Sequence, residues 1–184
     1  MEKVLTILIK DRYIGGMLKY IQEITSDYKF NSPPHITIRG PYIYNIRNKT
    51  IDKTKNFLFN LKNITLSHVD YFKIRNKFVI YIAVQNNELR KIFHKRDFPI
   101  KRSGYNPHVT ICKTSSFEKA QKLIKILNGE EIKFVIDKNE LQILAIDLDN
   151  NISLNYDYFK YASSDELNKK DECYSKIIKL LNLV

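Results

Sequence analysis

Two short stretches of the sequence place a histidine and a threonine in the same order. PHITIRGPY carries His35 and Thr37, and NPHVTICK carries His108 and Thr110. Side chains alternate between the two faces of a β-strand, so each histidine and its threonine share one face, roughly 6.6 Å apart along the strand. The residues between and after them are aliphatic and would anchor the opposite faces in a core: Ile36, Ile38, Val109 and Ile111. If the two strands face each other, two imidazoles and two hydroxyls converge.

Such a set of side chains suits acid–base chemistry on a phosphodiester, without a metal. The unperturbed pKa of histidine is about 6.5, so near neutral pH one imidazole can be neutral while its partner is charged. The neutral ring accepts a proton from the attacking hydroxyl or water, and the charged ring donates one to the departing oxygen. The threonine hydroxyls can donate hydrogen bonds to the non-bridging phosphate oxygens, where charge builds up.

Four further residues lie within or next to the two stretches. Arg39 would continue the face of Thr37 if that strand stays regular, and its guanidinium could bind phosphate with two hydrogen bonds. Tyr42 and Tyr105 could stack on a nucleobase, although a structural role is the alternative for both. By the same alternation, Cys112 falls on the face of His108, but nothing near it in the sequence indicates a nucleophile.

The composition indicates a soluble chain with an anionic ligand or a biased base composition. The net charge is +11, from 31 Lys and Arg against 20 Asp and Glu, and it is spread along the chain. The two cysteines are predicted to be reduced thiols, and a Gly-rich phosphate loop, an HExxH motif and a CxxC pair are all missing from the sequence. The apolar run at the N-terminus is too short for a signal peptide and its cleavage site. We therefore expect a cytoplasmic monomer without a cofactor, a metal or a membrane partner.

The order of the predicted elements partly repeats. Helices are predicted over 13–28, 47–62, 87–98 and 116–128, and strands over 3–10, 35–40, 64–74, 77–85, 108–113, 131–137, 141–148 and 152–162. Each half delivers one His-x-Thr strand near a helix, which predicts an α+β protein with two similar lobes related by an approximate two-fold axis. A possible capping box, Ser163 to Glu166, opens a C-terminal helix over 164–184 whose apolar stripe is expected to dock on the body. The prediction is one domain over 1–184, with its core in 1–162.

The paired motifs resemble those of the 2H phosphoesterase superfamily, which includes RNA 2′,3′-cyclic phosphodiesterases once called 2′-5′ RNA ligases. The resemblance extends over roughly residues 1 to 162. It implies a bilobal α+β fold with two antiparallel sheets around a central cleft and flanking helices. It also implies that His35 and His108 are the general acid and base, that Thr37 and Thr110 hold the phosphate, and that no metal is needed.

Two functions follow as hypotheses. The first is a phosphodiesterase that acts on a ribose 2′ or 3′ phosphodiester: a 2′,3′-cyclic phosphate, a 2′-5′ oligonucleotide or a cyclic oligonucleotide signal. The second is a non-catalytic protein that sequesters a nucleotide or an RNA end in the same cleft. The matched pair of proton-transfer groups favours the enzyme. In both cases the partner is a nucleotide or an oligonucleotide.

Overall fold

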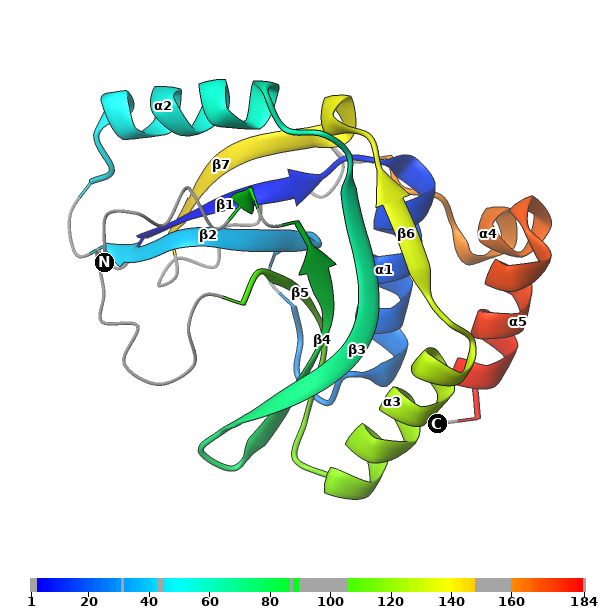
Figure 1. Cartoon of the computed structure of the whole chain (residues 1–184). Coiled ribbons are helices and arrows are strands. Elements are labelled where there is room, and N and C mark those ends of the chain that lie inside the picture. Colours follow the sequence, from blue (N-terminus) through cyan, green and yellow to red (C-terminus); the bar gives the residue numbers. More distant parts are fainter. Residues whose placement is uncertain are drawn as a thin grey trace.

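The computed structural model describes residues 3–30, 32–42, 45–86, 88–89, 106–147 and 160–183. In these ranges the chain forms one antiparallel sheet of seven strands with five α-helices, an α+β fold (Figure 1). The strands are β1 (Lys3–Ile9), β2 (His35–Tyr42), β3 (Ile64–Ile74), β4 (Lys77–Gln85), β5 (His108–Thr114), β6 (Lys133–Ile136) and β7 (Leu141–Asp147). The helices are α1 (Arg12–Thr25), α2 (Asn48–Phe59), α3 (Phe117–Gly129), α4 (Ser164–Lys170) and α5 (Glu172–Leu181), with a short 3-10 helix η2 (Lys138–Glu140).

The sheet is continuous where two separate sheets were expected. Its strand order is β6-β3-β4-β5-β2-β1-β7, so the two His-x-Thr strands, β5 and β2, are neighbours in its middle. They are antiparallel, and Ile36 pairs with Val109. Both of these side chains are fully buried, so the aliphatic residue inside each motif holds the two halves of the sheet together. The two-sheet arrangement is therefore corrected to one sheet, and the approximate two-fold axis stays a prediction.

The main hydrophobic core lies on one face of this sheet. All five helices contribute buried side chains to it, including Met17 of α1, Leu58 of α2, Leu123 of α3, Leu167 of α4 and Ile177 of α5. Figure 1 shows α2 near one end of the sheet and α3, α4 and α5 gathered near the other. A smaller apolar cluster of Val4, Leu8, Ile146 and Leu144 is separate from the main core. Successive residues of β1 thus divide between the two clusters, as the alternation of a strand buried on both faces requires.

Several predicted elements are confirmed and others are corrected. The hairpin of β3 and β4 has the predicted bounds, and its tight turn places Arg75 at a positive φ of 52°. The first helix ends at Thr25, before the predicted residue 28. The predicted helix 87–98 lies outside the described residues except for 88 and 89, and so does most of the predicted strand 152–162. Residues 160–162 are described and do not belong to a strand.

The C-terminal segment forms two helices where one was expected. Asp171 is extended and caps α5, its carboxylate accepting a hydrogen bond from the Cys173 N–H at 2.8 Å. The capping box of Ser163 and Glu166 is present at the start of α4. The apolar stripe of α5 is buried in the main core, so the docking of this segment on the body is confirmed. Within the described ranges, no helix is both long and apolar enough to cross a bilayer.

Gly40 is the residue of β2 that we expect to tolerate substitution least. Its φ is +120°, and a Cβ there would lie 2.8 Å from the Lys3 carbonyl oxygen. Gly40→Ala should lower the free energy of unfolding by about 1–3 kcal/mol, because the left-handed backbone is strained and the contact is with backbone. Urea denaturation would measure this. Gly129→Ala is the matched control, since nothing lies within 4 Å of its added Cβ. Equal stabilities of the two variants would contradict the strain at Gly40.

Candidate active site

The pairing of β2 with β5 brings the two His-x-Thr motifs together. Because Ile36 pairs with Val109, the antiparallel register sets His35 opposite Thr110 and Thr37 opposite His108. All four side chains are half-buried and lie on the face opposite to the main core. In a regular ladder the two histidines are diagonal neighbours, about 7–8 Å apart, which leaves room for a phosphate between the rings.

Each histidine is held by a backbone carbonyl that lies across a proline, and the Nδ1 atom of His35 also lies 3.4 Å from the Ser32 hydroxyl oxygen. The Nδ1 atom of His35 lies 2.8 Å from the Pro33 carbonyl oxygen, and the Nδ1 atom of His108 lies 2.7 Å from the Asn106 carbonyl oxygen. A carbonyl only accepts, so Nδ1 carries the proton and Nε2 is left for proton transfer. In each motif a proline separates the histidine from this carbonyl and, by fixing its own φ, restricts where the carbonyl points.

The prolines themselves are tied to the neighbouring strands. The Pro34 carbonyl accepts a hydrogen bond from the Ile9 N–H at 3.3 Å, at the end of β1. The Pro107 carbonyl accepts one from the Val84 N–H at 2.9 Å, near the end of β4. The segment that orients each imidazole is therefore fixed to the adjacent strand of the sheet.

Both imidazoles have a pKa below the ordinary value of 6.5. For His35 the main cause is burial, which disfavours the charged ring; the Pro33 carbonyl opposes it, and the positive charges of Lys113 and His108 lower the pKa further. For His108 burial again lowers the pKa, and the Asn106 carbonyl opposes it. The two rings are thus predisposed to be neutral at neutral pH, with Nε2 as a proton acceptor.

A β-bulge in β5 brings a lysine to the face of the imidazoles. Thr110 pairs with Tyr81 but Cys112 pairs with Ile80, so one extra residue is inserted and the alternation shifts. Cys112 consequently lies in the main core, where burial raises the pKa of its thiol to about 11. Its predicted place beside His108 is wrong for this reason. Lys113 takes the position on the imidazole face instead, where its charge acts on His35.

A bulge at the corresponding place in β2 redirects Arg39. Thr37 pairs with Thr6, but Arg39 pairs with Leu5, whose side chain is fully buried in the main core. Cross-strand partners share a face, so Arg39 does not continue the face of Thr37. The predicted phosphate contact depended on a regular strand, and this strand is not regular. Its role in substrate binding therefore has no support from the register.

The two tyrosines proposed to stack on a base have different outcomes. Tyr42 is 5% exposed and belongs to the main core, which favours its structural role. Tyr105 lies outside the described residues.

Two rings that were not predicted lie beside His108. The centroids of Tyr81 and Phe72 lie 4.9 and 5.4 Å from that of the His108 ring. Both belong to the predicted hairpin, on β4 and β3, but only the pairing of β4 with β5 brings them to the second motif. The alternation of side chains in the hairpin could have predicted that Tyr81 and Phe72 share a face. It could not have predicted that His108 lies next to them, because that contact depends on the pairing of β4 with β5.

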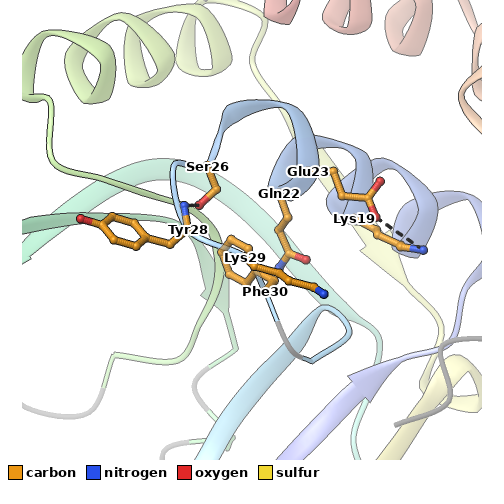
Figure 2. Close-up of a pocket in the computed structure, with 7 residues that line it drawn as sticks. All are labelled: Lys19, Gln22, Glu23, Ser26, Tyr28, Lys29 and Phe30. Atoms are coloured by element: carbon orange, nitrogen blue, oxygen red, sulfur yellow. Dashed lines mark hydrogen bonds and ion pairs between the residues drawn. The ribbon is translucent and has the colours of Figure 1, made fainter. Parts of the chain in front are cut away.

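A pocket of about 460 Å³ adjoins the far end of β5 (Figure 2). It is lined by residues of α1 and of the segment that follows it: Lys19, Gln22, Glu23, Ser26, Tyr28, Lys29 and Phe30. Gln22 donates from Nε2 to the Thr110 carbonyl at 2.7 Å, and the Ser26 hydroxyl bonds both the N–H and the carbonyl of Lys113 at 3.0 Å. These contacts fix the backbone of β5 where it carries Thr110 and Lys113.

Among the described residues, no group of three or more His, Cys, Asp or Glu side chains could hold a metal ion. The pairing of β2 with β5 and the bulge in β5 bring two imidazoles, two threonines and one lysine to one face of the sheet. Paired His-x-Thr strands side by side in an antiparallel sheet define the 2H phosphoesterase class.

The family follows from comparison with known proteins. A model of the 2′-5′ RNA ligase superfamily matches residues 18–150, which include both motifs, and the chain belongs to this family within the 2H phosphoesterases. A search of curated proteins found no match.

Lys113→Gln should raise the pKa of His35, because the substitution removes a positive charge that disfavours the imidazolium. NMR titration of the imidazole signals would measure the change. Lys133→Gln, on the edge strand β6, removes the same charge far along the sheet and serves as the control. An unchanged His35 pKa in Lys113→Gln would show that the lysine does not act on this imidazole.

Proposed function

We propose that the protein is a phosphodiesterase that acts on a ribose 2′ or 3′ phosphodiester by two-histidine acid–base catalysis, with no metal taking part. The candidate substrates are a 2′,3′-cyclic phosphate, a 2′-5′ oligonucleotide and a cyclic oligonucleotide signal. Membership of the family supports phosphodiester chemistry on a nucleotide or RNA substrate. The observation that carries the proposal is the pair of Nδ1–carbonyl hydrogen bonds, which leaves Nε2 of both rings available for proton transfer.

The proposed reaction needs only proton transfers and one displacement at phosphorus. The neutral imidazole takes the proton of the attacking hydroxyl at Nε2 as the new P–O bond forms. The protonated imidazole donates its Nε2 proton to the oxygen whose bond to phosphorus breaks. The attacking group is water for a cyclic phosphate, or the neighbouring ribose hydroxyl where the linkage leaves it free. His35 and His108 fill these two roles.

Three other side chains would stabilise the charge that develops on the phosphoryl oxygens. Thr37 and Thr110 carry hydroxyls on the same face as the imidazoles and can donate hydrogen bonds to the non-bridging oxygens. Lys113, delivered to this face by the bulge, supplies a positive charge beside them. Such groups accelerate the reaction because they are fixed before the charge appears.

The sequestering alternative fits the electrostatics of the site less well. A neutral imidazole whose Nδ1 proton is committed to a carbonyl presents only a lone pair at Nε2, which repels a phosphate oxygen. A phosphate-binding histidine requires the charged ring, yet burial lowers the pKa of both rings. The arrangement favours proton transfer over simple binding.

Removal of either imidazole should abolish turnover. His35→Ala and His108→Ala are each expected to lower kcat by about 10²–10⁴-fold, the usual contribution of a general acid or base. The test incubates the protein in EDTA with a 2′,3′-cyclic mononucleotide, a cyclic-phosphate RNA end, 2′-5′ oligoadenylate and several cyclic oligonucleotides, with products read by mass spectrometry. His68→Ala, outside both motifs, is the control. Tight binding without product would favour the sequestering protein, and turnover that survives both substitutions would remove the two histidines from the mechanism.

The lowered pKa values of the two imidazoles predict that kcat/KM is higher at acid than at alkaline pH. The general acid must be protonated, and the pKa of each imidazole in the free protein lies below 6.5. As the pH rises above this value the protonated form is lost, so kcat/KM should fall by about tenfold for each pH unit on that limb. Rates measured from about pH 5 to about pH 9 would show the slope. A kcat/KM that stays level to the alkaline end would contradict lowered values in the free protein.

A further inference from the structure

Tyr81 is a buried tyrosine next to His108, and its hydroxyl takes part in a hydrogen bond. Tyr81 is 7% exposed, and its hydroxyl oxygen accepts a hydrogen bond from Asn106 Nδ2 at 3.1 Å. Asp70 lies opposite Tyr81 in the register of β3 and β4. Burial chiefly raises the pKa of Tyr81, and the charge of Asp70 and its hydrogen bond with the phenol raise it further. The phenol therefore stays protonated while its oxygen accepts the hydrogen bond from Asn106.

Asn106 is also the residue that orients His108. Its backbone carbonyl accepts the hydrogen bond from His108 Nδ1. The residue is thus held by its side chain to Tyr81, and the next residue, Pro107, is held by its carbonyl to Val84 of β4. The carbonyl lies between two anchors, both of them on the same strand. If the side-chain anchor is removed, the segment is fixed on one side only.

In the first motif, the carbonyl that holds the imidazole is positioned in a different way. The carbonyl that holds His35 belongs to Pro33, whose ring fixes its own φ. The residue at the corresponding position of the second motif is Asn106, whose φ is not restrained by a ring. In the second motif the residue that supplies the carbonyl is held by its side chain, through the hydrogen bond from Asn106 Nδ2 to the Tyr81 hydroxyl.

We propose that Tyr81 is a positioning residue for His108: by holding the Asn106 side chain, it fixes the carbonyl that sets the tautomer and direction of that imidazole, and it does not act on His35. The part of this inference that concerns catalysis rests on the proposed function. The part that concerns the ring itself does not.

The consequence for titration has a definite sign. The Asn106 carbonyl raises the pKa of His108 against the effect of burial, so a loosened carbonyl lets the pKa fall. The titratable groups on this face of the described residues include His35 on β2, Tyr81 on β4 and, opposite Tyr81, Asp70 on β3, and Lys113 follows His108 on β5. Tyr81→Phe leaves the ionisable groups of Asp70 and His35 in place. A change in pKa confined to His108 therefore reports a change in the position of the Asn106 carbonyl.

The first test is NMR of the imidazole nitrogens in the full chain, with Tyr81→Phe compared with the unaltered protein. We expect His108 to lose its uniform Nδ1–H tautomer and to titrate at lower pH, while the His35 signals stay the same. Tyr71→Phe is the matched control, because it removes a phenol hydroxyl from a residue whose ring packs against Phe78 and Phe117 instead. Unchanged His108 signals, or equal changes at both histidines, would overturn the proposal.

A second variant tests the route through Asn106. Asn106→Ala keeps the backbone carbonyl but removes the amide that Tyr81 holds, so it should reproduce the effect of Tyr81→Phe on His108. The double variant should add nothing, because both changes break one connection. Full additivity would mean that Tyr81 acts on the ring by another route.

Turnover separates this inference from the proposed function. In the active protein, Tyr81→Phe should lower kcat by about tenfold with KM little changed, the loss expected for one hydrogen bond that orients a catalytic group. If the unaltered protein turns over no substrate but the NMR effect at His108 is present, the proposed function fails and the positioning role stands. If turnover is present and Tyr81→Phe leaves both kcat and the His108 signals unchanged, the positioning role fails alone.

Discussion

The site depends on one antiparallel contact, the pairing of Ile36 with Val109. These two side chains are fully buried on one face of the sheet, so the residues on either side of each are forced to the other face. A slip of one residue in either strand would send the histidine of that strand into the core and its aliphatic residues to the opposite face. The relative position of the two imidazoles is thus set by the register of the backbone, and the hydrophobic core enforces that register.

Two local features of β2 and β5 determine the surroundings of the imidazoles. The carbonyl two residues before each histidine holds Nδ1, across a proline that is itself hydrogen-bonded to the adjacent strand. A bulge then follows each threonine at the same offset, and the two bulges have different results. In β5 it brings Lys113 to the imidazole face, while in β2 it is followed by Gly40 at positive φ, where a side chain would meet the Lys3 carbonyl. The matched motifs therefore carry unequal surroundings, with the cation supplied by the second.

The sequence predicted much of this fold and the core of the site. Alternation was sufficient to place His35 with Thr37, and the hairpin of β3 and β4 was predicted to the residue. The pairing that joins the two halves of the sheet was not predicted, because it is formed between strands that are far apart in the chain. The bulges were also hidden, since their inserted residues are ordinary members of an aliphatic run; Arg39 and Cys112 were misplaced for that reason. Tyr81 could not be assigned to His108 before the neighbour of β4 was known.

The same burial that lowers the pKa of both imidazoles works against the fold in acid. A histidine whose pKa is lower in the folded than in the unfolded chain binds fewer protons when folded, so stability falls as the pH drops below the unfolded value near 6.5.

Asp27 adds a second loss of stability at lower pH. Lys119 and Thr114 hold the pKa of its carboxyl below 3.8, so the stability it contributes is present above that value and is lost as the pH falls through the folded pKa. The Asp27 carboxylate also accepts the hydrogen bond of Thr114, at the end of the strand that carries His108, so its protonation acts on a contact of that strand. Acid therefore acts on the fold that holds the imidazoles as well as on the imidazoles themselves.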